Sequence, residues 1–135
     1  MAIFGGLSKH FNFGLLLLRI GLGFMMIMHG YPKLFGGVEK WTAVGGAMKN
    51  LGIHDFPHFW GFMAAFAETI GGLLFMLGFL FRPAAFLLLF TMIVAAVLHL
   101  SNGEGLMGAS HPIEAAVVFL AMFIIGPGKY SVDRR

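Results

Sequence analysis

Long apolar stretches separated by short polar segments dominate the pattern of this chain. A transmembrane helix needs about 20 apolar residues, because the hydrocarbon core of a bilayer is about 30 Å thick and each helical residue rises about 1.5 Å. We therefore predict an all-α integral membrane four-helix bundle in which residues 1–135 form a single domain. The predicted spans cover about residues 13–35, 58–81, 83–100 and 111–126.

Proline and glycine mark where these spans begin and end. Pro83 suits the first turn of a helix and follows Arg82 directly, so we expect the second and third spans to be antiparallel neighbours joined by a very short turn. The Gly126-Pro127-Gly128 sequence stops the fourth span.

The segment 38–51 is too short and too polar to span. Its apolar residues Trp41, Val44, Met48 and Leu51 recur at helical spacing. We interpret it as a short interfacial helix between the first and second spans, with Trp41 as its anchor. An ordinary loop helix packed on the bundle is the alternative.

Composition supports a membrane protein. Charged residues make up 11% and hydrophobic residues 59% of the chain, whereas a soluble domain has about 25% charged residues. The net charge of +3 comes from basic residues that stand singly beside apolar stretches, which favours contact with anionic lipid headgroups over nucleic acid. The chain has no cysteine, which excludes disulfides and Cys-ligated iron–sulfur clusters in this subunit.

The distribution of basic residues predicts the orientation in the membrane, because Lys and Arg concentrate on the cytoplasmic side. With an even number of spans, both termini lie on one side. That side carries more basic residues than the other and is therefore expected to be cytoplasmic. The residues compared are Lys9, Arg82, Lys129, Arg134 and Arg135 on the side of the termini, and Lys33, Lys40 and Lys49 on the opposite side.

Small residues indicate which helix faces pack together, since helix contacts in lipid depend on close approach. We expect three stripes to face the bundle interior. They are Gly61, Ala65, Glu68 and Gly72 in the second span, Ala84, Leu88, Thr91 and Ala95 in the third, and Gly14 and Gly21 in the first.

Ionisable residues at membrane depth are costly, by about 2.5–3.5 kcal/mol each on insertion scales, and need a reason to be there. Glu68 lies near the middle of the second span, and Arg19 lies inside the first. We expect a buried ion pair between Glu68 and Arg19. The pair can fix the register of the helices or take part directly in function, and the sequence does not decide between these roles.

The remaining polar residues converge on the end of the bundle opposite the termini. There they can line a polar cavity that accepts a quinone headgroup, transfers protons or holds a metal. His29 facing Glu68 is the central pair of this hypothesis. Each histidine can instead cap a helix or reach toward the headgroups. A haem held by His29 and His99 is disfavoured because no haem-attachment motif is present, and we assign no metal site. The candidate binding residues are Arg19, Tyr31, Lys33, His99, His111 and Glu114.

Three blocks of sequence resemble the DoxX family and together cover nearly the whole chain. They are RIGLGFMMIMHGYPKLFGG, with its Arg, His-Gly and Lys; AETIGGLLFMLGFLFRPAAFLLLFTMIVA, with Glu-x-x-Gly-Gly and Arg-Pro; and the closing IIGPGKYSVDRR. The resemblance implies a small four-helix protein of the bacterial inner membrane. The positions that it carries over are Arg19, His29, Gly30, Lys33, Glu68 and Arg82.

The resemblance also implies a link to oxidoreductases, because a member of the family is the membrane subunit of a thiosulfate:quinone oxidoreductase and others act with soluble enzymes. Our leading hypothesis is a membrane subunit of an oxidoreductase system that binds a quinone-like molecule, with Glu68 and His29 handling protons. The alternative is a non-catalytic carrier of lipids or small molecules, or an assembly factor for soluble redox enzymes. Expected partners are membrane lipids, a soluble redox enzyme and further copies of the chain. The sequence leaves open whether the chain catalyses a reaction by itself.

Overall fold

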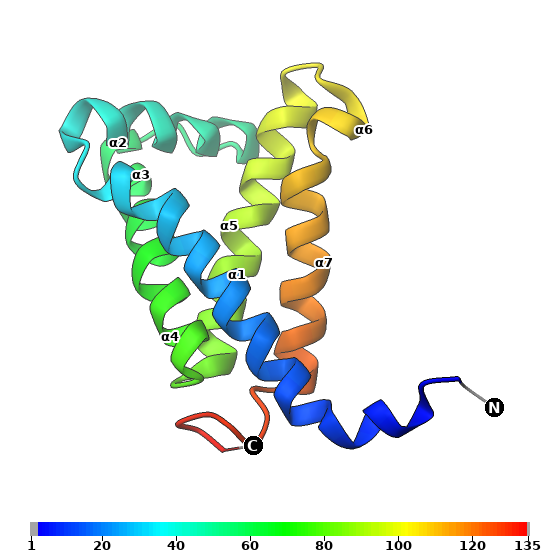
Figure 1. Ribbon diagram of the computed structural model, residues 1–135. Helices are drawn as coiled ribbons and strands as arrows, with labels where there is room; N and C mark the ends of the chain where they lie inside the picture. Colours follow the sequence, from blue (N-terminus) through cyan, green and yellow to red (C-terminus); the bar gives the residue numbers. More distant parts are fainter. Residues whose placement is uncertain (1–2, 135) are drawn as a thin grey trace.

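The computed structural model describes residues 3–134, and over this range the chain is built from helices joined by short connections. Figure 1 shows both termini at the same end of the bundle, here called the terminal end. The elements, in order, are the 3-10 helix η1 (Gly5–His10), α1 (Phe11–Leu34), α2 (Gly37–Gly45), the 3-10 helix η2 (Gly46–Leu51), α3 (Pro57–Phe66), the π-helix η3 (Ala67–Gly71), α4 (Gly72–Leu77), α5 (Phe81–Ser101), α6 (Gly105–Gly108) and α7 (Ser110–Ile125).

Three helical stretches are long and apolar enough to cross a membrane: Gly5–Leu34, Pro57–Leu77 and Phe81–Ser101. The helix Ser110–Ile125 is apolar but has 16 residues, which corresponds to a length of about 24 Å. The all-helical membrane fold is therefore confirmed. That α7 forms a fourth span stays a prediction, because it is shorter than the hydrocarbon core is thick.

The second and third spans meet at a different place from the one predicted. The second helix ends at Leu77, and Gly78 follows in a left-handed conformation with φ 70°. Helix α5 begins at Phe81, so Arg82 and Pro83 lie in its first turn and not in the connection.

A residue far away in sequence explains this early start. The carboxylate of Asp133 accepts hydrogen bonds from the backbone N–H groups of Leu80 and Phe81, at 3.2 and 2.8 Å. These are unpaired donors at the start of α5, and a carboxylate there also interacts favourably with the helix dipole. The C-terminal segment thus caps a helix that lies about fifty residues earlier in the chain.

Helix α1 packs against the α3–η3–α4 helix through glycines, as expected in lipid. A Cβ atom on Gly23 would lie 2.6 Å from the carbonyl oxygen of Gly72, so the two backbones touch. The prediction for Gly14 and Gly21 is wrong, because both are exposed and would meet nothing within 4 Å. The packing face is formed by Gly23 and Gly30, which have the same seven-residue spacing.

The aromatic core lies toward the terminal end. The ring of Phe75 stacks on Phe81 at 4.8 Å and meets Phe119 edge-on at 5.3 Å, and all three side chains are fully buried. Ala84 and Leu88 of α5 are also fully buried, as their stripe predicts. This core joins α4, α5 and α7.

Helices α2 and η2 lie across the end of the bundle opposite the termini (Figure 1). Gly45 and Gly61 bring α2 into backbone contact with α3, since a Cβ atom on either would overlap backbone atoms of the other helix. Trp41 packs on Phe62 at 5.0 Å and donates its indole N–H to the carbonyl of Lys33. The segment is thus packed on the bundle, and Trp41 fixes it to α1 and α3; its depth relative to a bilayer stays a prediction.

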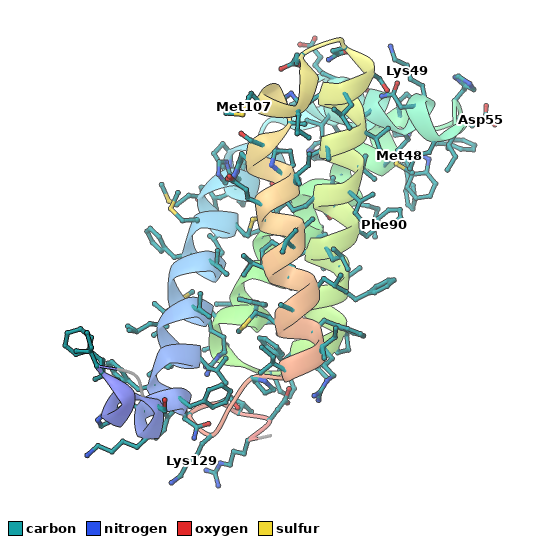
Figure 2. All side chains as sticks on the ribbon, turned by 90° about the vertical axis from the view of Figure 1, so that its right-hand side faces the viewer. Met48, Lys49, Asp55, Phe90, Met107 and Lys129 are labelled. Atoms are coloured by element: carbon teal, nitrogen blue, oxygen red, sulfur yellow. The ribbon has the colours of Figure 1, made fainter. Side chains whose placement is uncertain are left out.

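Basic residues lie at both ends of the bundle. Figure 2 shows Lys49 at one end and Lys129 at the other. Arg135 lies outside the described residues. That the terminal end is cytoplasmic stays a prediction, supported by the basic residues Lys9, Arg82, Lys129 and Arg134 there.

Candidate functional site

Glu68 lies in a local distortion of the second helix. Residues Ala67–Gly71 form one π-helical turn inside the otherwise α-helical stretch Pro57–Leu77. Such turns are rare and occur often at functional sites. The hydroxyl of Thr69 donates to the carbonyl of Ala65 at 2.8 Å, which is a contact that bends helices. The carboxylate is buried, with 3% of Glu68 exposed.

The partner of Glu68 is Lys33. The Lys33 Nζ atom lies 3.2 Å from both carboxylate oxygens of Glu68 and donates to each. Gly30 makes this possible, because a Cβ atom there would lie 2.6 Å from the Glu68 Cβ atom and would push the helices apart. The His-Gly-Tyr-Pro-Lys sequence at the end of α1 therefore brings an ammonium group to a buried carboxylate.

A cavity of about 560 Å³ lies beside this ion pair. Its wall is mostly apolar, and Lys33 and Glu68 both line it. This volume is in the range of sites for small organic ligands, which combine apolar walls with a few polar groups. The other lining residues are Ala43, Val44 and Gly45 of α2, Ala47 and Met48 of η2, Trp60, Met63, Ala64 and Phe66 of α3, Ala67 of η3, and Leu87, Phe90, Thr91, Val94, Ala95, Leu98 and His99 of α5.

The predicted ion pair between Arg19 and Glu68 is wrong. The Arg19 guanidinium donates to the backbone carbonyls of Pro127, Tyr130 and Met76, at 3.2, 2.8 and 3.0 Å. Arg19 is 2% exposed and lies at the terminal end. Its carbonyl partners come from the end of α4 and from the C-terminal segment. It therefore joins three parts of the fold and does not line the cavity.

The error has a physical cause. Depth along the bundle can be counted at about 1.5 Å per residue from the last residue of α1 and the first residue of α3. On this count Glu68 lies about 16 Å deep and Arg19 about 22 Å deep, whereas Lys33 lies at the surface. This estimate assumes that both helices start at one level. The Gly30 contact shows that they do not: Glu68 lies level with Gly30, which is one turn from Lys33.

Arg82 also has a structural role. Its guanidinium donates to the carbonyls of Phe123 and Ile124, at 3.0 and 3.4 Å, which are unpaired acceptors at the end of α7. The side chain of Asn12 likewise accepts from the backbone N–H of Lys129 at 2.9 Å. Arg82 and the closing block that begins with Gly-Pro-Gly are both part of the resemblance to the DoxX family. These contacts show that they hold the terminal end of the bundle together.

His29 and His111 form a pair. Their ring centroids lie 5.4 Å apart, between α1 and α7. Both side chains are exposed and neither lines the cavity. His29 directly precedes Gly30, whose backbone approaches Glu68 closely. The structure thus brings His29 and His111 together outside the cavity.

His99 lies at the cavity and pairs with Glu104 of the following connection, with Nδ1 2.9 Å from Oε1. The hydrogen bond from His99 holds the pKa of the Glu104 carboxyl below its usual value. His29, which is paired with His111, does not line the cavity at which His99 lies. Within residues 3–134, no three His, Asp or Glu side chains are grouped to hold a metal ion.

Tyr31 and Glu114 do not contribute to the cavity. Tyr31 is 56% exposed and its ring packs on Phe35 at 4.8 Å. Glu114 is exposed on α7, and the ion pairs found within residues 3–134 do not include it. Neither Glu114 nor His111, which were both predicted as binding residues, lines the cavity.

Most of the cavity wall was not predicted as part of a site, because it carries no ionisable group. Met48, Trp60 and Thr91 are examples. One signal was available, because Trp41 and Met48 share a helical face in a segment that spans nothing. The apolar face of a short amphipathic helix between two spans needs an apolar surface to pack on. Here that face covers the cavity.

Comparison with known proteins gives a consistent result. "Inner membrane protein YphA" of Escherichia coli is 30% identical over 94% of this chain and 97% of its own length. "Inner membrane protein YqjF" of Escherichia coli is 30% identical over 95% of both chains. The "Putative oxidoreductase CatD" of Bacillus subtilis is 33% identical over 67% of this chain and 63% of its own length. No solved structure matches the chain significantly.

The fold and the buried ion pair define the class as a small helical membrane protein with a ligand-sized cavity between its helices. The family model of DoxX matches residues 14–100, which include Arg19, Lys33, Glu68 and Arg82. The chain belongs to the DoxX family.

Proposed function

We propose that this protein of the inner membrane binds a quinone-like molecule in the cavity between α2, α3 and α5, as the membrane part of an oxidoreductase system. The observation that carries the proposal is the Lys33–Glu68 ion pair in the wall of an otherwise apolar cavity. The names of the relatives from Escherichia coli support the inner membrane, and the name of the relative from Bacillus subtilis supports the link to oxidoreductases.

The ion pair is a poor choice for stability alone. Taking two charges out of water costs several kcal/mol per ion, and an apolar pair of similar volume is often as stable or more stable. Helix packing does not require it here, since glycine contacts and the aromatic core already hold α1, α4 and α5 together. Ionisable residues inside a membrane protein mark functional sites by default. A ligand that interacts with both charges explains why they are kept.

A quinone suits this pair chemically. Its ring is flat and apolar, and its two carbonyl oxygens accept hydrogen bonds. The Lys33 ammonium, which lines the cavity, has donors for one of them. Reduction of a quinone to a quinol takes up two electrons and two protons. In this proposal a soluble redox partner supplies both electrons, and Glu68 passes the two protons to the ring one after the other.

His29 extends this role toward the surface. It lies on α1 one turn from Lys33, exposed, and paired with His111. Histidine exchanges protons near neutral pH. We propose that His29 and His111 pass protons between the surface and Glu68, while Lys33 holds the ring. Arg19 takes no part in this step, because it is bound to carbonyls at the terminal end.

The test is quinone binding to the purified protein in nanodiscs. A short-tailed ubiquinone analogue should bind saturably to the wild type, and Glu68→Gln and Lys33→Met should each weaken binding at least about tenfold, or about 1.4 kcal/mol. Glu39→Gln and Lys40→Met are matched controls on the exposed face of α2 and should bind like the wild type. Absence of saturable binding, or equal binding by all variants, contradicts the proposal.

A carrier of lipids or small molecules would use the same cavity. Transport of the bound molecule across proteoliposomes without any change in its redox state would favour that function. An assembly role could use the polar C-terminal segment 129–134, but this segment also supports the fold. Tyr130 and Asp133 hold Arg19 and cap α5, so substitutions there act first on stability.

A further inference from the structure

Helix contacts narrow the cavity at both ends of the bundle. On the side opposite the termini, α2 and η2 cover it, and Met48 is buried there with 6% exposed. The Gly45–Gly61 contact leaves no gap between α2 and α3. Toward the terminal end, a Cβ atom on Gly71 would lie 3.6 Å from Leu88, so the two helices are in van der Waals contact. These contacts favour a route for a ligand from the side of the bundle over a route along its axis.

The cavity opens sideways, between α3 and α5. Four of its lining residues are also among the exposed apolar side chains. Figure 2 shows Phe90 projecting outward from α5 on the side where Met48 lies above it. These four residues surround a mouth that faces the acyl chains of a bilayer. They are Met63 at 40% exposed, Phe66 at 41%, Leu87 at 45% and Phe90 at 46%.

We propose that the cavity receives the ring of a lipid-soluble quinone through this mouth, and that the isoprenoid tail stays in the mouth and the surrounding bilayer. This inference rests on the proposed function for the nature of the headgroup and adds the route and the tail. The polar groups that a ring can reach, Lys33 and Glu68, lie at the inner wall, and the rim is apolar. The tail is longer than the cavity and has to leave through its opening.

The apolar rim selects against ordinary phospholipids. A phosphate headgroup would have to lose its water to pass Phe66 and Phe90, and burying an unpaired charge is very costly. A neutral ring loses little on the same path. Other polar groups near the cavity are already paired: Thr91 donates to the carbonyl of Leu87, and Trp60 donates to the carbonyl of Asp55. The cavity thus offers one polar wall and one apolar opening.

The natural absence of cysteine allows a reversible test of the route. In Met63→Cys/Phe90→Cys, a cleavable bifunctional thiol reagent bridges the mouth, and a reductant opens it again. A matched control is Phe86→Cys/Phe123→Cys, on α5 and α7, where the native rings lie 6.2 Å apart away from the cavity. Quinones quench indole fluorescence, so Trp60 in the cavity wall reports binding, and Trp60→Phe measures the signal that does not come from the cavity.

The bridged mouth should slow or weaken binding of a decyl-tailed benzoquinone at least tenfold in nanodiscs, with recovery after reduction, while the control pair has no effect. Unchanged binding with the mouth bridged would overturn the route and leave the proposed function standing if Glu68→Gln still abolishes binding. Equal binding of the tailless ring, compared at equal membrane concentration, would overturn the role of the tail. No saturable quenching in the unbridged protein, or a phospholipid that the quinone does not displace, would overturn both proposals.

Discussion

Lys33 and Glu68 form a two-pronged ion pair between α1 and the π-helical turn of the second helix, with the ammonium 3.2 Å from both carboxylate oxygens. The side chains differ in exposure: 30% for Lys33 and 5% for Glu68. The carboxylate is therefore fixed inside the bundle, while the lysine reaches it from near the surface. The pair therefore consists of a buried carboxylate and a partly exposed ammonium group.

Removing one partner of this pair should destabilise the protein more than removing both. Lys33→Met leaves an unpaired buried carboxylate, and losses from such single changes are about 3–5 kcal/mol, reduced here because Lys33 is partly exposed. In Lys33→Met/Glu68→Gln no charge remains, so most of this loss should be recovered. Thermal unfolding of the variants in one detergent measures the order. A double variant as unstable as the sum of the two single variants would contradict a direct pair.

The double variant also separates stability from function. It should fold as well as or better than Glu68→Gln and still fail to bind quinone. If it binds like the wild type, the pair has a structural role and the proposed function loses its main support.

Arg19 should affect stability and not ligand binding. Lysine cannot donate to Pro127, Tyr130 and Met76 in the geometry of the guanidinium, so Arg19→Lys should lower stability by about 2–4 kcal/mol, and Arg19→Met by more. The readouts are unfolding temperature and protease cleavage within residues 128–134. Quinone affinity of Arg19→Lys, measured where it is folded, should match the wild type. A loss of quinone affinity in a variant that is as stable as the wild type would show that Arg19 takes part in binding.

Two adjacent glycines offer a matched test of how α2 is held. Gly45→Ala places a Cβ atom onto the backbone of Pro57 and should displace α2, destabilising the fold and opening the cavity. Gly46→Ala meets nothing within 4 Å and should be neutral or stabilise by about 0.5–1 kcal/mol. Thermal unfolding and Trp60 fluorescence distinguish the two. Similar behaviour of both variants would show that α2 is not tightly packed.

The His99–Glu104 pair predicts a small pH dependence. Because the pKa of Glu104 is lowered in the folded protein, its contribution to stability is present above the usual carboxyl pKa and is lost as the pH falls through the lowered value. The unfolding temperatures of wild type and Glu104→Gln should therefore differ near neutral pH and converge in acid. A difference that grows as the pH falls would have the wrong sign for this pair.

The positions of the long helices could be predicted from the sequence, because a span depends on local composition. The stretch of apolar residues before Phe35 and the interruption near Arg82 are visible without any tertiary information. Glu68 could be identified in the same way, since a carboxylate inside an apolar stretch is conspicuous. Helix ends were less accurate, because the start of α5 depends on Asp133, which is distant in sequence.

The partner of Glu68 could not be predicted from the sequence. It depends on how far the start of α3 is offset along the bundle axis from the end of α1. The close contact between Gly30 and Glu68 sets this offset. Arg19 misled the prediction because its true partners are backbone carbonyls of Met76, Pro127 and Tyr130, which no side-chain pattern reveals. The cavity was foreseen only as a gathering of polar groups, although most of its wall is apolar.

The most direct test of the central claim is photoaffinity labelling of the protein in nanodiscs with an azido-quinone, followed by peptide mass spectrometry. The cavity predicts labelling on α3 and α5 at residues such as Met63 and Phe90, competed by unlabelled quinone and lost in Glu68→Gln. Labelling that instead follows lipid exposure, with Val117 and Ile124 of α7 modified equally and no effect of Glu68→Gln, would contradict it.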